Sequence, residues 1–198
     1  MVGRVETSCQ FNLKVWTLFQ FAAFGQRMAR VTLLRHGKSE NPQTGVSDFD
    51  RALIKRGQQN ADNVGKMMVR QKMLPDLVLV SSAMRTKQTY EIASQNWPDI
   101  PMEFVDSLYE ATANQLMYVI EERAGQSQNM LVIGHNPSLV VLLNRMVGST
   151  HIDNNLSYFP TCCIADIGFE ADKVSDIDPE DGRLLSIMRA RDLDLRSL

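Results

Sequence analysis

The sequence predicts an α/β fold in three layers (α/β/α), with helices on both faces of a mostly parallel central sheet. Two observations support this prediction. Short, continuous apolar segments alternate with longer segments whose apolar residues recur at helical spacing, from residue 30 to residue 148. No linker, internal repeat or low-complexity tract interrupts the chain, so residues 28–198 are expected to form a single domain.

Residues 1–27 do not share this alternating pattern. The segment LKVWTLFQFAAFGQ at 13–26 is apolar, but polar residues interrupt it and Glu6 lies where a signal peptide would carry basic residues. The segment is also too short and too mixed to span a bilayer. We expect a disordered N-terminal extension, or one outside the native protein if translation starts at Met28. The alternative is a targeting or membrane-associated leader.

Short runs of apolar, β-prone residues predict the strands. Three of them are continuous and are expected to pair in parallel as buried strands, because helical segments separate them: 30–34, 76–80 and 130–134. Two later runs at 162–169 and 183–190 flank an acidic loop and predict an antiparallel edge of the same sheet.

Helical spacing of apolar residues predicts four helices, at 57–71, 83–95, 114–125 and 137–148. Capping residues support their ends. Ser82 and Asn136 are placed to cap the second and fourth helices, with Pro137 at the first position of the fourth. Gly125 is placed to end the third helix in a left-handed conformation, and Gly148 is expected just past the end of the fourth.

The composition excludes some classes of partner. The formal net charge is −2, and no basic stripe or aromatic platform occurs, so neither nucleic acid nor an anionic membrane is expected as a partner. Any anion site must therefore be built locally from a few cations. We expect a monomer or a weak dimer.

Cysteine and histidine positions favour a reducing compartment and give no signal for a metal. The cysteines are Cys9 and the adjacent pair at 162–163, which suggest no disulfide framework. The histidines at 36, 135 and 151 are far apart, and no cluster has zinc-ligand spacing. A cytoplasmic protein without a metal or other cofactor is expected.

Polar residues follow each of the three predicted parallel strands at the point where the strand ends. The sequence RHG occupies 35–37, SSAMR occupies 81–85 and GHN occupies 134–136. Because the carboxyl ends of parallel strands share one edge of a sheet, these segments are expected to meet there, beside two helix amino ends that favour anions. Their cationic and imidazole side chains describe a phosphate site: Arg35, His36, Arg85 and His135.

Each of these residues also has an ordinary structural explanation. His36 would then be a strand-end histidine bonded to the backbone, the arginines would be solvated surface cations, and His135 would only begin a helix. An independent coincidence at all three strand ends is the weaker explanation, so the joint pattern favours a shared anion site.

Four segments in order, LLRHG, SDFDRALIKRG, DLVLVSSAMRTKQTYEIA and MLVIGHNPSLV, give the chain a family resemblance. Together they resemble the histidine phosphatase superfamily, whose fold is phosphoglycerate-mutase-like, and within it the SixA-type phosphohistidine phosphatase branch. The resemblance extends from about residue 28 to about residue 188. The tripeptide RHG alone would be weak evidence, whereas the four segments at the right relative distances are strong evidence.

The resemblance implies a role for each matching residue. His36 matches the nucleophile that becomes phosphorylated, and His135 matches the second histidine of the pocket. Arg35 and Arg85 match the arginines that clamp the phosphoryl oxygens. Arg51 matches a further arginine beside the phosphate in the short branch.

Two further residues are expected to bind the substrate, and two positions depart from the branch. Gly37 would let the backbone approach the ligand, and Asn136 would lie near it at a helix start. The branch often has proline and threonine where this chain has Ala52 and Ile54. These changes concern the local helix start more than the chemistry.

The chemistry expected of this set is phosphoryl transfer through a phosphohistidine enzyme intermediate, followed by attack of water. His36 must attack as a neutral ring, and nearby guanidiniums should lower its pKa. A protonated His135 would donate to a phosphoryl oxygen. Since the arginines supply the positive charge, no metal is needed.

The leaving group decides the substrate class. Glu110 is the candidate general acid for an alcohol leaving group, although it could equally be an ordinary surface carboxylate. A leaving imidazole has a pKa of about 6.5 and needs little proton donation. The predicted function is therefore a metal-independent phosphohistidine phosphatase. A sugar-phosphate or other small-metabolite phosphomonoesterase is one alternative, and a non-catalytic phosphate-binding regulatory module is another. The expected partner is a phosphorylated protein or a small phosphorylated metabolite.

Overall fold

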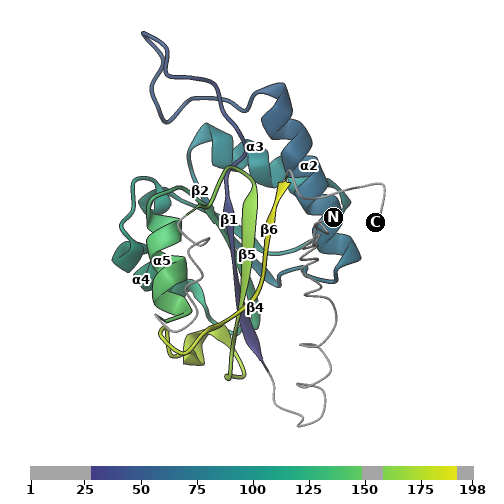
Figure 1. The fold of residues 1–198 in the computed structure, drawn as a ribbon, viewed down its shortest axis with the longest axis vertical. Helices are drawn as coiled ribbons and strands as arrows, with labels where there is room; N and C mark the ends of the chain where they lie inside the picture. Colours follow the sequence, from purple (N-terminus) through teal and green to yellow (C-terminus); the bar gives the residue numbers. More distant parts are fainter. Residues whose placement is uncertain (1–27, 149–157, 191–198) are drawn as a thin grey trace, which may run out of the picture.

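The computed structural model describes residues 28–148 and 158–190, which form a central sheet with helices on both faces (Figure 1). The sheet has six strands in the order β3-β2-β4-β1-β5-β6. The predicted three-layer α/β/α fold is confirmed. The expected N-terminal extension and His151 lie outside the described residues.

Four neighbouring strands of the sheet are parallel. They are β1 (Ala29–Arg35), β2 (Leu77–Ser81), β3 (Met102–Val105) and β4 (Asn129–Gly134). β4 lies between β1 and β2, and the last residue of β1, Arg35, is paired with the last residue of β4, Gly134. The carboxyl ends of these strands therefore lie together at one edge of the sheet.

The expected antiparallel edge is formed by β5 (Cys163–Phe169) and β6 (Arg183–Arg189). β5 pairs antiparallel with β1 on one side and with β6 on the other. All seven residues of β5 are buried, which explains why its sequence is almost continuously apolar.

Two helices cover each face of the sheet. The helices α2 (Lys55–Arg70) and α3 (Met84–Ala93) pack on one face, and α4 (Ala113–Arg123) and α5 (Ser138–Met146) pack on the other (Figure 1). Each pair encloses its own apolar core with the sheet, since side chains of α2 and of α4 and α5 belong to two separate buried clusters. Three short 3-10 helices complete the described chain: Ser94–Asn96, Asp106–Leu108 and Val174–Asp176.

Two of the predicted helix caps are wrong. The Ser82 hydroxyl donates to the Asp106 carboxylate, and α3 begins after Ala83 without a side-chain cap. Asn136 donates from its Nδ2 to the carbonyl of Phe159, 2.8 Å away. Pro137, expected inside the fourth helix, is instead the residue before it and follows a cis peptide bond. The side chains of Ser82 and Asn136 thus connect the ends of β2 and β4 to other segments by hydrogen bonds.

The predicted left-handed cap at Gly125 and the predicted place of Gly148 past the end of its helix are confirmed. Gly125 has φ +50° and Gly148 has φ +63°, each just beyond the end of its helix. A capping box at Thr112 and Gln115 starts α4.

Close packing around α2 also depends on glycine. A Cβ at Gly65 would lie 2.0 Å from the carbonyl oxygen of Ala93, and one at Gly57 would lie 2.1 Å from that of Lys38. The first contact sets the α2–α3 packing, and the second brings the start of α2 against the segment that follows β1. Within residues 28–148 and 158–190, no helix is both long and apolar enough to cross a membrane.

Candidate active site

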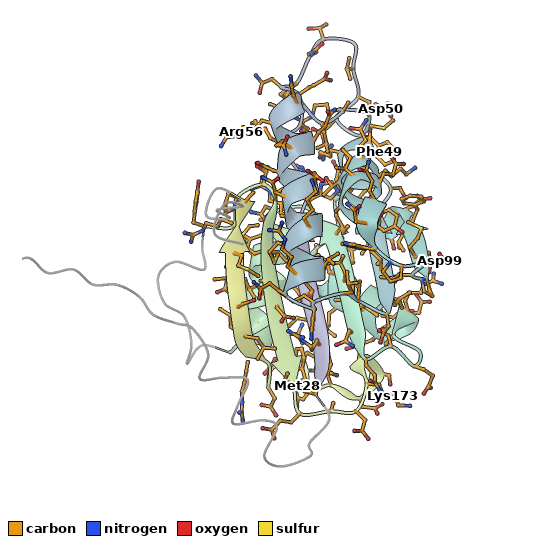
Figure 2. The ribbon with its side chains drawn as sticks, turned by 90° about the vertical axis from the view of Figure 1, so that its right-hand side faces the viewer. Met28, Phe49, Asp50, Arg56, Asp99 and Lys173 are labelled. Atoms are coloured by element: carbon orange, nitrogen blue, oxygen red, sulfur yellow. The ribbon has the colours of Figure 1, made fainter. Side chains whose placement is uncertain are left out.

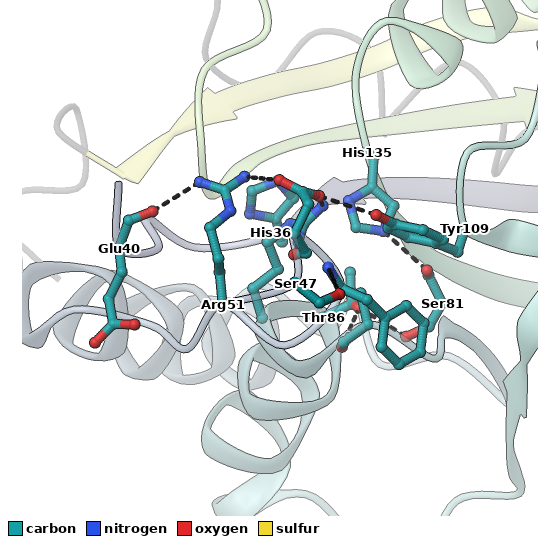
Figure 3. A network of polar contacts seen from close by, with 12 residues as sticks. His36, Glu40, Ser47, Arg51, Ser81, Thr86, Tyr109 and His135 are labelled. Carbon is teal, nitrogen blue, oxygen red and sulfur yellow. Dashed lines mark hydrogen bonds and ion pairs between the residues drawn. The ribbon is translucent and has the colours of Figure 1, made fainter. Parts of the chain in front are cut away.

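A cavity of about 780 Å³ lies at the edge of the sheet where β1, β2 and β4 end. It is lined by both expected histidines and all three expected arginines, which come from four separate segments of the chain. Figure 3 shows Arg51, His36, His135 and Tyr109 directed toward one another in this region. The predicted site residues that line the cavity are Arg35, His36, Arg51, Arg85, Glu110, His135 and Asn136.

The ring of His36 has a defined orientation and tautomer. Its Nδ1 lies 2.7 Å from the carbonyl oxygen of Gly37. A carbonyl only accepts hydrogen bonds, so Nδ1 carries the proton and Nε2 of the neutral ring carries the lone pair. This arrangement leaves Nε2 as the nitrogen able to act as a nucleophile.

The neutral form of His36 is strongly favoured. Its pKa is lowered to about 3, mainly by burial. The nearby His135, Arg85 and Arg35 contribute to this shift, and the hydrogen bond to Gly37 opposes it. The sequence predicted the contribution of the arginines, but burial is the larger cause. At neutral pH the ring is therefore ready to attack without first losing a proton.

His135 lies beside His36, with ring centroids 5.1 Å apart. Its Nε2 is 2.8 Å from Ser81 Oγ at the end of β2, and its Nδ1 is buried without a partner. Burial, followed by the charge of Arg85, lowers the pKa of His135 to about 4, while the carboxylate of Asp48 opposes that shift. In the ligand-free cavity His135 is therefore neutral.

Three arginines bring positive charge to the cavity from different elements. Arg35 ends β1 and donates from Nη1 to the carbonyl of Phe159 at 2.9 Å. Arg85 lies in the first turn of α3 and is 5% exposed. Arg51 lies before α2 and donates from Nη1 to the carbonyl of Glu40 at 2.7 Å (Figure 3). Burial is the main cause that lowers the pKa of Arg35.

Unpartnered polar atoms mark this cavity as a binding site. Among the described residues, seven buried side-chain nitrogen or oxygen atoms have no hydrogen-bond partner, and five of these belong to residues lining the cavity. They are Nε of Arg35, Arg51 and Arg85, Nδ1 of His135 and Oδ1 of Asn136. Buried polar groups are rarely left unpaired, so this cluster points to a binding site, and the three guanidinium N–H donors suit an anion.

Two residues that the sequence reasoning missed join the site. Asp48 lines the cavity, and its carboxylate forms ion pairs with both Arg51 and Arg85. The hydroxyl of Tyr109 donates to Asp48 Oδ2 at 3.0 Å, and the tyrosine ring packs edge-on against His135 at 5.6 Å. Asp48 lies three residues before Arg51 in the SDFDRAL segment, and this spacing could have identified it.

Gly37 lies behind the nucleophile rather than in the cavity. It is buried, is not among the cavity-lining residues, and donates from its backbone nitrogen to Thr89 Oγ1 at 2.9 Å. A Cβ at Gly37 would lie 2.9 Å from the carbonyl oxygen of Gly57. Its role is thus to hold His36 through its own carbonyl, in a space too tight for a side chain.

Glu110 lines the cavity from an exposed position immediately after Tyr109. It has φ +54°, in the left-handed region that non-glycine residues rarely adopt. Its carboxyl is therefore presented to the cavity by a turn between the 3-10 helix at Asp106–Leu108 and α4. In the described part of the chain, no group of three or more His, Cys, Asp or Glu side chains could hold a metal ion.

The chain is similar in sequence to known proteins. The family model of the histidine phosphatase superfamily (branch 1) matches residues 31–126. An uncharacterized protein of Mycobacterium tuberculosis is 31% identical over 137 residues, which cover 67% of this chain and 84% of that protein.

Solved structures extend the similarity over most of the chain. The structure of a protein assigned as a SixA phosphohistidine phosphatase from Agrobacterium tumefaciens has a TM-score of 0.71 and 28% identity, covering 81% of this chain and 97% of that one. The protein histidine phosphatase SixA complexed with tungstate has a TM-score of 0.68 and 21% identity, covering 83% of this chain and 99% of that one. At 21% identity, the similarity to the tungstate-bound SixA structure concerns the fold alone.

Proposed function

The chain belongs to the histidine phosphatase superfamily, and we propose that it is a metal-independent phosphatase of the SixA type that hydrolyses phosphohistidine. The observation that carries this proposal is the state of His36. Its Nδ1 is fixed by the Gly37 carbonyl, its ring is neutral, and it lies among three arginines in one cavity.

In the proposed first step, His36 Nε2 attacks the phosphorus atom of the substrate. The Nε2–P bond forms while the bond between phosphorus and the leaving group breaks. Nδ1 keeps its proton, and the hydrogen bond to Gly37 O stabilises the positive charge that develops on the ring. Arg35, Arg51 and Arg85 bind the phosphoryl oxygens and stabilise their charge without a metal ion.

In the second step, water attacks the phosphorus of the phosphohistidine. The Nε2–P bond breaks, the neutral ring of His36 is restored and inorganic phosphate leaves. A bound phosphoryl dianion would raise the pKa of His135 from its low ligand-free value, so that the ring can then donate to a phosphoryl oxygen.

The leaving group and the open rim favour phosphohistidine as the substrate. A departing imidazole needs weak proton donation, because its pKa is about 6.5. The cavity rim carries exposed side chains such as Lys38, Glu110 and Val141, so a histidine on another protein can approach it. The proposed partner is therefore a phosphorylated protein. We also propose a cytoplasmic location, since the adjacent, buried Cys162 and Cys163 suggest no disulfide framework.

The position of Glu110 favours a second candidate, hydrolysis of the phosphate ester of a small metabolite. An alcohol leaving group needs a general acid, and Glu110 presents an exposed carboxyl on the rim of the cavity. The same carboxyl is unnecessary for a leaving imidazole.

The test compares turnover of a phosphohistidine peptide with turnover of alkyl phosphates, in wild type and Glu110→Gln. Glu121→Gln, an exposed carboxyl on α4 away from the cavity, is the matched control. We expect phosphohistidine turnover to dominate and to survive both substitutions. Dominant alkyl phosphate turnover that is lost in Glu110→Gln alone would replace the phosphohistidine assignment with the metabolite phosphatase.

A further inference from the structure

Asp48 has every oxygen atom engaged among the cations of the cavity. Its Oδ2 accepts from Arg85 Nη2 at 2.9 Å and from the Tyr109 hydroxyl at 3.0 Å. Its Oδ1 pairs with Arg51 Nη2, and its backbone carbonyl accepts from Arg85 Nη1. One residue therefore joins two guanidiniums that come from different segments of the chain.

The backbone next to Asp48 is anchored. The carbonyl of Phe49 accepts a hydrogen bond from the backbone nitrogen of Met84 at the start of α3, at 2.9 Å. The Phe49 ring packs edge-on against Tyr109, with centroids 5.0 Å apart. Figure 2 labels Phe49 at the end of the molecule opposite Met28, where the parallel strands end. These contacts hold the Asp48 carboxylate in one place, although about half of its side chain is exposed.

The contacts of Asp48 also fix the orientation of each guanidinium. Both terminal nitrogens of Arg85 face Asp48, and those of Arg51 face Asp48 and the carbonyl of Glu40. The Nε of each arginine is buried and has no partner. The contacts of the terminal nitrogens thus fix the plane of each guanidinium, while its Nε–H has no acceptor within the protein.

We propose that Asp48 is a positioning residue, which holds Arg51 and Arg85 in the orientation that stabilises the phosphoryl group during transfer. This inference rests on the phosphatase activity proposed above. Asp48 does not bind the substrate itself, because a carboxylate would repel the phosphoryl oxygens. Its contribution is to keep the two positive groups at fixed positions, because they would otherwise repel each other.

Two other roles for Asp48 give different kinetics. If Asp48 only occupied the anion position and competed with the substrate, removing its charge would raise kcat/KM. If Asp48 only maintained the local fold, its removal would weaken turnover and anion binding together. A positioning residue instead affects the transition state, in which a small displacement can cost about 100-fold in rate.

The experiment uses Asp48→Asn, which keeps the size of the side chain and removes its charge. We expect kcat to fall about 10- to 100-fold. The dissociation constant of inorganic phosphate, measured by calorimetry, should stay equal or decrease, because a negative charge has left the anion site. Tyr109→Phe, which removes one hydrogen-bond donor to Asp48, should change kcat and the dissociation constant of phosphate in the same directions by smaller factors. Asp50→Asn, an exposed carboxylate in the same segment and outside the cavity-lining set, should match wild type.

Each remaining result for Asp48→Asn would overturn the inference. An increase in kcat/KM would make Asp48 a competitor of the substrate, and a joint loss of turnover and phosphate binding would make it a purely structural residue. Unchanged kcat would leave it without a role. The inference about Asp48 is judged by the ratio of the variant's kcat to the wild-type kcat, measured on any phosphorylated substrate that wild type hydrolyses. The proposed function is judged separately, by wild-type turnover of phosphohistidine.

Discussion

Replacing Thr89 with valine removes one hydroxyl behind the nucleophile while keeping the volume of the side chain. Thr89 is fully buried on α3; its Oγ1 accepts from the Gly37 nitrogen at 2.9 Å and donates to the Arg85 carbonyl at 2.6 Å. In Thr89→Val the Gly37 N–H loses its acceptor in a buried place, which costs about 1–3 kcal/mol of the free energy of unfolding. For a domain of this size each kcal/mol lowers Tm by about 2–4 °C, so Tm should fall by roughly 2–12 °C.

The same substitution should slow the chemistry. The carbonyl of Gly37 orients the His36 ring, so a looser Gly37 lets the ring leave its attacking orientation. We expect kcat to fall about tenfold, which corresponds to about 1.4 kcal/mol in the activation free energy. Circular dichroism melting and steady-state turnover, measured well below Tm, test both effects, with Thr89→Ser as the control that keeps the hydroxyl. Wild-type kcat in Thr89→Val would refute the role of the Gly37 contact in orienting His36.

Three further predictions concern protonation, packing and thiol reactivity. Because the pKa of His36 is lowered to about 3, mainly by burial, its ring should remain neutral from pH 8 to pH 5, and its NMR signals should not titrate in that range. An ordinary histidine, with a pKa of about 6.5, would be mostly protonated at pH 5. Titration of the His36 signals near pH 6.5 would contradict the burial of its ring. Gly65→Ala should lower the free energy of unfolding by about 1–3 kcal/mol in urea denaturation, since its Cβ would meet the Ala93 carbonyl at 2.0 Å; unchanged stability would refute the tight α2–α3 contact. Burial raises the pKa of Cys162 to about 12, so Cys162 should resist iodoacetamide at pH 8 until the protein unfolds, as mass spectrometry can show. Rapid alkylation of the folded protein would contradict its burial.

Most elements could be predicted because burial leaves a simple pattern in the sequence. β1, β2 and β4 are covered on both faces, so each is a continuous apolar run. β3 was missed for the opposite reason. It is an edge strand of four residues, Met102–Val105, of which Val105 alone is buried. A half-exposed edge strand this short carries no periodic signal.

The helix starts show where local rules fail. Ser82 and Asn136 are good capping residues by type, but each bonds to a distant segment, Asp106 or the carbonyl of Phe159. Both positions lie at strand ends beside the cavity, where tertiary contacts compete with local capping.

The candidate site was only partly predictable. Arg35, His36, Arg85 and His135 could be grouped because the ends of parallel strands meet at one edge of a sheet. Arg51 needed the family resemblance, since it lies in an irregular segment before α2. The spacing of Asp48 and Arg51 within one segment could have suggested their ion pair. The ion pair of Asp48 with Arg85 joins residues far apart in the sequence, so no local spacing could predict it.

The most direct test of the central claim is to trap the phosphorylated enzyme and identify the modified ring nitrogen. The enzyme is incubated with a labelled phosphohistidine donor, quenched in alkali and analysed by peptide mapping and phosphorus NMR. We expect one phosphate on Nε2 of His36, because the hydrogen bond from Nδ1 to Gly37 leaves Nε2 free, and no label in a folded His36→Ala variant, which should also lack hydrolysis. Phosphate on Nδ1 of His36 or on His135, or full hydrolysis by His36→Ala, would contradict the claim.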